Sequence, residues 1–217
     1  MNRFVTLLAV PAVLAAAASA DVVLNGGFES GSAGDADNWF ETPIFGGGAT
    51  ASVERADDSP FGGAWHMSLT VAGAADFGPV AVLQQQTALD SVAPGDIVSF
   101  DVMARRNGAL GPGVVVFLEV QWLDSDGSNG GGVKGSTGLL EIGGGLTDTY
   151  QSFGFADAVV AADADAALIN ISLVGGAFDG SDGAAYFDNA SLVVVPAPGV
   201  PALLVLGGVL RRRPRRA

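Results

Sequence analysis

Short segments of alternating apolar residues, separated by turn dipeptides, limit what this chain can fold into. In segment 65–71, Trp65, Met67, Leu69 and Val71 fall on one side of an extended chain. Asp-Gly, Gly-Gly, Pro-Gly and Asn-Gly steps interrupt the sequence at many points, and no helical period is sustained. About eight short strands without intervening helices predict an all-β fold, in which antiparallel sheets pack face to face as a β-sandwich. The other predicted strands are 22–24, 80–87, 97–105, 114–123, 150–155, 167–174 and 185–195, and a helical turn is expected within 157–166.

The composition agrees with one compact domain and excludes several classes of function. Apolar residues make up 49% of the chain, which is too high for a disordered protein. The absence of cysteine excludes disulfides, thiolate metal sites and a cysteine nucleophile.

The charge of the central segment is strongly negative. All 23 acidic residues lie between Asp21 and Asp188, and the only basic residues there are Arg55, Arg105, Arg106 and Lys134. Such a field repels nucleic acids and anionic membranes, so neither is expected as a partner. It attracts cations, calcium first among them, or alternatively serves only to keep the protein soluble.

The first 20 residues have the pattern of a secretory signal peptide. Arg3 precedes an apolar run from Phe4 to Ala18, and Ala18 and Ala20 form an A-x-A cleavage site. We therefore expect an N-terminal signal helix, cleavage after Ala20 and an exported mature chain.

The last 22 residues, 196–217, resemble a PEP-CTERM sorting tail. Pro196, Pro198 and Gly199 precede a short apolar helix, and an arginine cluster containing Arg211, Arg212 and Arg213 follows it. The helix of about 12 residues would extend only ~18 Å, against a hydrocarbon core of ~30 Å. The resemblance implies recognition by an exosortase-type enzyme, transient anchoring in the inner membrane through this tail, and a final place at the cell surface or in the extracellular matrix. Ala197 stands where that family carries its glutamate.

The segment 21–195 resembles galactose-binding-like jelly rolls, the fold of many carbohydrate-binding modules. LNGGFES followed by NWF resembles their opening strand, LQQQTALDSVAPGDIVSFDVMARRN their middle strands, and AYFDNASLVVV their closing strand. The resemblance implies polysaccharide binding. It also implies a structural calcium joining the first and last strands through Glu29 and Asp188. The alternative is that these two carboxylates only bind neighbouring backbone amides.

Alternation within the strands indicates which side chains could line a ligand groove. Asp101 and Arg105 share one side of segment 97–105, Glu119 and Gln121 share one side of 114–123, and Asn170 lies opposite apolar neighbours. Planar polar groups of this kind bind sugars, although an ordinary solvated sheet face has the same pattern. The three tryptophans, Trp39, Trp65 and Trp122, are expected in the core, which leaves no evident aromatic platform.

Two acidic loops resemble calcium loops only in part. The sequence from Asp124 to Asn129 has the Asp-x-Asp-Gly start, but Gly135 occupies the position of the EF-hand glutamate. A polar hairpin loop is therefore expected here, and the same holds for 178–183.

Catalysis has little support in the sequence. His66 is the only histidine, and no Gly-x-Ser-x-Gly elbow is present. We therefore expect an exported, non-catalytic carbohydrate-binding protein. The alternatives are an acidic structural matrix protein without a sugar site and, less favoured, a glycoside-active enzyme, since paired carboxylates cannot be recognised from spacing in sequence.

Overall fold

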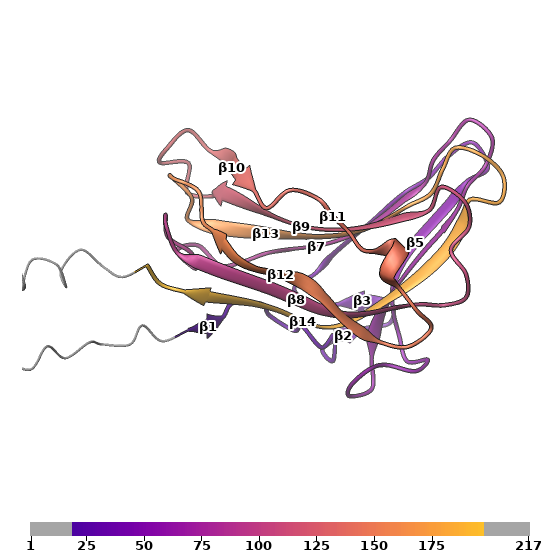
Figure 1. Cartoon of the computed structure of the whole chain (residues 1–217), viewed down its shortest axis with the longest axis horizontal. Helices are drawn as coiled ribbons and strands as arrows, with labels where there is room; N and C mark the ends of the chain where they lie inside the picture. The colour runs from indigo at the N-terminus through magenta and orange to yellow at the C-terminus, as the bar shows by residue number, and fades with distance from the viewer. Residues whose placement is uncertain (1–18, 198–217) are drawn as a thin grey trace, which may run out of the picture.

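A computed structural model describes residues 19–197, which form two antiparallel sheets packed face to face (Figure 1). The first, here called the β8 sheet, has the order β12 (Gln151–Val159), β8 (Ile97–Arg106), β14 (Asp182–Val195), β6 (His66–Ala72) and β5 (Thr50–Ala56), with β1 (Ala20–Asp21) beside β14. The second, the β9 sheet, has the order β10 (Gly132–Ser136), β9 (Val115–Asp124), β13 (Ala166–Val174), β7 (Val80–Gln86) and β4 (Phe40–Ile44), with β11 (Leu140–Glu141) beside β9. The remaining elements are a hairpin of β2 (Gly31–Ser32) and β3 (Asp35–Ala36) and a 3₁₀ turn, η1 (Gly143–Gly145).

Successive strands alternate between the two sheets along much of the chain, as β6, β7, β8 and β9 do. All the strand pairs are antiparallel. This arrangement confirms the predicted antiparallel β-sandwich.

The core lies between the sheets and follows the alternation of the sequence. Every second residue of β8, β9 and β13 is buried, and Phe100 and Phe187 are among the largest fully buried side chains. Burying one such phenylalanine contributes about 1.5–3 kcal/mol. The intervening residues of the same strands face outward, so the rigid core fixes the positions of the side chains on both outer faces.

The structure corrects three local predictions. Residues 22–24 follow the short strand β1 and are not themselves a strand. No helical turn forms within 157–166: β12 continues through a bulge between Phe155 and Ala158, where Asp157 adopts a φ of 57°, and an ordinary turn follows it. Trp39 and Trp122 lie in the core as predicted, whereas Trp65 is half-buried with the guanidinium of Arg55 3.8 Å from the centre of its ring.

The two ends of the described domain lie side by side (Figure 1). Ala20 in β1 is opposite Val194 in β14, and Pro196 is exposed just beyond β14. Within residues 19–197 no helix is long and apolar enough to cross a membrane. The predicted signal helix with Ala18, and the sorting-tail residues from Pro198 onward, including Gly199, Arg211, Arg212 and Arg213, lie outside the described residues.

Candidate functional site

The five residues predicted to line one groove lie on two opposite faces of the sandwich. Asp101 and Arg105 project from the outer face of the β8 sheet, since the residues that alternate with them are buried. Glu119, Gln121 and Asn170 project from the outer face of the β9 sheet. The prediction of a single groove was therefore wrong. Alternation identifies the outward side of a strand, but it does not identify the sheet that contains the strand.

A line of side chains crosses the outer face of the β9 sheet. Phe40 of β4 is opposite Gln84 of β7, Gln84 is opposite Asn170 of β13, and Asn170 is opposite Glu119 of β9. Neighbouring strands lie about 4.8 Å apart, so these four positions span roughly 14 Å. Gln121 is the next outward residue of β9. We call Phe40, Gln84, Asn170, Glu119 and Gln121 the cross-strand row.

Hydrogen bonds within the cross-strand row orient its polar groups. Gln84 Nε2 donates to Asn170 Oδ1, and Gln121 Nε2 donates to Glu119 Oε2 at 3.0 Å. These bonds use one polar atom of each side chain and leave the second atom of each for a ligand. The row therefore offers donors from Asn170 and acceptors from Gln84, Gln121 and Glu119 in fixed directions.

Two aromatic rings lie on the same face as these polar groups. Phe40 is 65% exposed at the edge of the sheet, and Phe117 is partly exposed two residues before Glu119 on the same side of β9. Neither ring was predicted from the sequence, because only the tryptophans were considered as aromatic platforms. The signal for Phe40 was its place directly after Trp39, whose burial requires the next residue of an extended chain to point outward.

On the opposite face, Arg105 is held between two tyrosine rings. Its guanidinium carbon is 4.3 Å from the centre of the Tyr186 ring and 5.2 Å from that of Tyr150. Burial raises the pKa of Tyr150 to about 12, although Arg105 opposes this rise, so the phenol is neutral. Arg105 and Tyr150 line an open cavity of about 520 Å³ together with Phe61. Arg105 thus belongs to a site separate from the cross-strand row, and Asp101 is exposed on the same outer face as Arg105.

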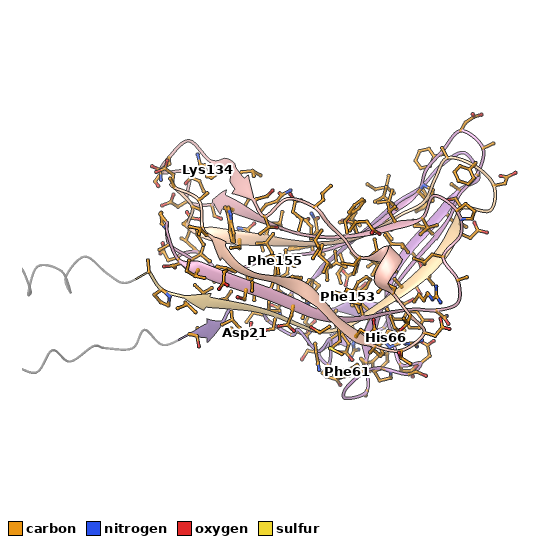
Figure 2. The ribbon with its side chains drawn as sticks, viewed as in Figure 1. Asp21, Phe61, His66, Lys134, Phe153 and Phe155 are labelled. Atoms are coloured by element: carbon orange, nitrogen blue, oxygen red, sulfur yellow. The ribbon has the colours of Figure 1, made fainter. Side chains whose placement is uncertain are left out.

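His66 lies on the outward side of β6, as the alternation predicts, but it is fully buried. Its ring is 4.6 Å from that of Tyr186, and Nε2 is 3.4 Å from Asp58 Oδ1. Burial lowers the pKa of His66 more than Asp58 raises it, so the imidazole is neutral near pH 7. Within the described residues neither ring nitrogen has a hydrogen-bond partner, so no serine or threonine hydroxyl is paired with it for nucleophilic catalysis. Figure 2 shows His66 and Phe61 at the same end of the β8 sheet.

Glu29 and Asp188 lie on either side of the loop that leads into β6. Asp188 Oδ2 accepts hydrogen bonds from the amides of Phe61 at 2.9 Å and Gly62 at 3.0 Å. Glu29 Oε1 accepts from the amides of Ala64 at 2.9 Å and Trp65 at 3.1 Å. These four hydrogen bonds match the alternative prediction, in which Glu29 and Asp188 bind neighbouring backbone amides.

The charges of the same two carboxylates bear on the predicted calcium. Asp188 is fully buried, and burial raises its pKa, with a further rise from the neighbouring Glu29 charge. Within residues 19–197 neither carboxylate forms an ion pair with a lysine, arginine or histidine. Calcium at Glu29 and Asp188 remains a prediction.

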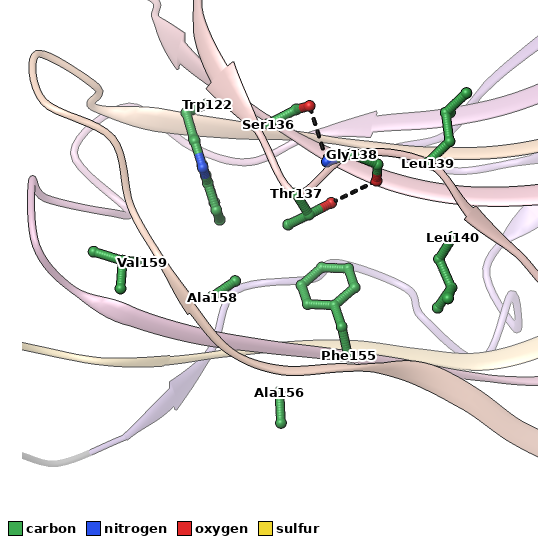
Figure 3. Close-up of a pocket in the computed structure, with 10 residues that line it drawn as sticks. All are labelled: Trp122, Ser136, Thr137, Gly138, Leu139, Leu140, Phe155, Ala156, Ala158 and Val159. Carbon is green, nitrogen blue, oxygen red and sulfur yellow. Dashed lines mark hydrogen bonds between the residues drawn. The ribbon is translucent and has the colours of Figure 1, made fainter.

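A pocket of about 410 Å³ opens at the edge of the sandwich, between β12 and the chain that follows β10 (Figure 3). The rings of Trp122 and Phe155 face it, and Leu139 and Leu140 lie on the opposite side. The hydroxyl of Thr137 is already bonded, since it donates to Gly138 O and accepts from the Val120 amide. The hydroxyl of Ser136 likewise accepts from the Gly138 amide, so both hydroxyl side chains of this pocket are already bonded to the chain around them, and the pocket suits a sugar less well than the cross-strand row does.

Comparisons with known proteins find similarity in fold and none in sequence family. No family model and no curated protein matches the sequence. Among solved structures, the enzymatically active domain of tailspike protein 4 from bacteriophage CBA120 is 18% identical, with a TM-score of 0.55 over 81% of this chain and 21% of that chain. The Stig cyclase Fisc from Fischerella sp. TAU is 13% identical, with a TM-score of 0.54 over 83% of this chain and 100% of that chain. The CBM22-1 xylan-binding domain of Xyn10C from Paenibacillus barcinonensis is 15% identical, with a TM-score of 0.51 over 84% of this chain and 99% of that chain.

These similarities define the class of fold. The chain has the β-sandwich that is also found in carbohydrate-binding modules, and it spans about a fifth of the tailspike structure that it matches. Because a xylan-binding domain, a cyclase and an enzymatically active tailspike domain all share the sandwich, the fold alone does not assign a function.

Proposed function

We propose that this protein is an exported, non-catalytic carbohydrate-binding protein whose cross-strand row holds an oligosaccharide. The observation that carries the proposal is the strand register, which lines up Phe40, Gln84, Asn170 and Glu119 across four neighbouring strands. A row of roughly 14 Å is long enough to contact more than one sugar ring.

The chemistry of the cross-strand row matches that of a sugar. A sugar hydroxyl both donates and accepts hydrogen bonds, so it needs amide N–H groups and carbonyl or carboxylate oxygens together, as Asn170 and Glu119 offer. The C–H faces of a sugar ring are apolar and pack on aromatic rings, which Phe40 and Phe117 supply on the same face. Because these side chains project from strands, binding requires little reorganisation of the backbone.

A glycan array tests the proposal directly. The purified protein is applied to a broad panel of plant and bacterial polysaccharides, first with calcium and then after chelation with EGTA. We expect reproducible binding to one class of glycan. Silence across the panel under both conditions would exclude a carbohydrate-binding role and favour the acidic matrix protein.

Support for export comes from the sequence at the two ends of the chain. The signal peptide ending at Ala20 and the tail that begins at Pro196 favour export, recognition by an exosortase-type enzyme and a place at the cell surface or in the extracellular matrix. Cleavage after Ala20 would remove one of the two residues of β1 and its pairing with Val194, and the other strands of both sheets lie outside the removed segments. Mass spectrometry of the exported protein tests this proposal: we expect Asp21 as the first residue, and a retained leader would refute it.

A structural calcium is part of the proposal. Glu29 and Asp188 would hold it, and the ion would neutralise the repulsion between the two carboxylates. Asp188 belongs to the last strand and Glu29 to the first loop, so the ion would fasten the two ends of a domain that lacks disulfides.

Support for a non-catalytic role comes from the state of the one histidine. His66 is buried, neutral and unpaired with any hydroxyl in the described domain, so it cannot act as the base of a serine triad. The alternative, an acidic structural matrix protein, is favoured by one observation, the excess of 23 acidic residues over 10 basic ones.

A further inference from the structure

Three aspartates from two distant segments meet at the end of the sandwich where β9 turns into β10. Asp124 ends β9, Asp126 lies in the following loop, and Asp165 directly precedes β13. One carboxylate oxygen from each lies within 4.8 Å of the others. Oxygen ligands lie 2.3–2.6 Å from a calcium ion, so two ligands of one ion are at most about 5 Å apart. The spacing of the three carboxylates fits a single ion.

The backbone holds two of these carboxylates in place. Asp165 accepts hydrogen bonds from the amides of Ser125 at 2.8 Å and Asp126 at 3.0 Å, which fastens the β9–β10 loop to the segment before β13. Asp124 Oδ2 accepts from the amides of Asn129 at 3.0 Å and Gly131 at 2.6 Å.

The second oxygen of Asp124 is an independent sign of a missing ligand. The Asp124 side chain is fully buried, yet its Oδ1 atom has no hydrogen-bond partner within the described residues. Oδ2 accepts both hydrogen bonds from the loop amides, so Oδ1 is the oxygen of this carboxylate that is left without a partner. A buried carboxylate oxygen without a partner has lost its hydration with nothing in exchange, so such atoms are rare in native proteins.

The charges near the cluster are not balanced. Lys134 of β10, labelled in Figure 2, lies with its Nζ atom 3.3 Å from Asp124 Oδ2. Among residues 19–197 it is the one basic residue that forms an ion pair with any of the three carboxylates. One ammonium against three carboxylates leaves an excess of two negative charges, which a divalent cation would neutralise.

We propose that Asp124, Asp126 and Asp165 bind a divalent cation, calcium by its preference for oxygen ligands. Asp165 supplies the carboxylate that an EF-hand glutamate would give and that the loop after Asp124 lacks. It comes from a segment about 40 residues away, so the sequence of the loop alone could not predict it. The ion stabilises the β9–β10 hairpin next to Gln86 of β7, whose side chain donates to Ser125 Oγ at 3.1 Å. This site is separate from Glu29 and Asp188.

Calorimetric titration of the full chain with calcium chloride tests the proposal. The main variant is Asp126→Asn, because this residue is exposed and asparagine can still accept the hydrogen bond from the Ser128 amide. We expect calcium affinity at this site to fall at least tenfold. The matched control, Asp179→Asn, removes an exposed aspartate near the opposite end of β13 and should leave the affinity unchanged.

Two further variants separate calcium binding at this cluster from a purely structural ion pair and from binding at the chain ends. Lys134→Gln removes the competing ammonium and should strengthen calcium binding severalfold, which a purely structural ion pair would not do. Glu29→Gln should leave the binding at the aspartate cluster intact, whatever happens at the chain ends. Calcium binding that is unaffected by Asp126→Asn, or that is lost only with Glu29→Gln, would overturn the proposal, as would a folded wild-type protein that binds no calcium.

Discussion

Replacing Gly63 by alanine should loosen the clamp that Glu29 forms on the loop before β6. Gly63 has a φ of 62°, and a Cβ atom there would lie 2.1 Å from Glu29 Oε1 and 2.5 Å from its carboxyl carbon. Glu29 would have to move and give up its hydrogen bonds to the amides of Ala64 and Trp65.

The magnitude follows from two contributions. The left-handed backbone costs an alanine about 1–2 kcal/mol. The two lost hydrogen bonds are partly exposed and contribute about 0.5–1.5 kcal/mol each. We therefore expect the free energy of unfolding to fall by about 2–5 kcal/mol. A loss of 3 kcal/mol lowers the melting temperature by about 6–12 °C in a domain of this size.

Gly108→Ala is the matched control for this substitution. Gly108 has a φ of 79°, so it carries the same backbone cost, but nothing lies within 4 Å of a Cβ atom there. Urea unfolding of both variants isolates the contribution of the Glu29 clamp, expected at about 1–3 kcal/mol. Equal destabilisation by the two substitutions would refute the argument that Glu29 is fixed in this position.

Two further predictions concern the two outer faces. Phe40→Ala should weaken glycan binding severalfold in calorimetry. Because the ring is 65% exposed, the free energy of unfolding should change by less than about 0.5 kcal/mol. A large loss of stability would instead assign Phe40 to the core. His66 has a lowered pKa, so the unfolded chain takes up a proton below about pH 6.5 that the folded chain does not, and stability falls on acidification from pH 6.5 toward the lowered pKa. Urea unfolding at pH 7.5 and 5.5 should show a smaller acid loss for His66→Gln than for the wild type, and identical losses would contradict this assignment.

The central strands could be predicted from the sequence because their alternation of apolar and polar residues is strong. β7, β8, β9 and β13 bury every second residue against the core, and β14 does so from Ala190 to Val194, so most of these buried positions are apolar. The edge strands β4 and β5 were missed, because β4 has no buried residue and β5 buries only Val53 and Arg55. Edge strands pack on one side at most, and their sequences carry a correspondingly weak pattern.

The site was predictable only in part, for a related reason. Alternation correctly identified Glu119, Gln121 and Asn170 as outward-facing, but it could not pair them with Gln84 and Phe40, because pairing depends on strand order and register. It also grouped Arg105 with them, although β8 belongs to the other sheet. The proximity of Asp165 to Asp124 could likewise not be predicted from the sequence, because only the tertiary structure brings their side chains together.

The most direct test of the central claim compares one substitution on each outer face of the sandwich. Asn170→Ala removes the middle polar side chain of the cross-strand row, and Asp101→Asn changes an exposed residue of the opposite face. Loss of two hydrogen bonds to a sugar costs about 1–3 kcal/mol, which is roughly a 5- to 150-fold loss of affinity. Calorimetry with the glycan selected on the array should show this loss for Asn170→Ala and unchanged affinity for Asp101→Asn. Unchanged affinity for a folded Asn170→Ala protein, or a loss confined to Asp101→Asn, would contradict the placement of the sugar on the β9 sheet.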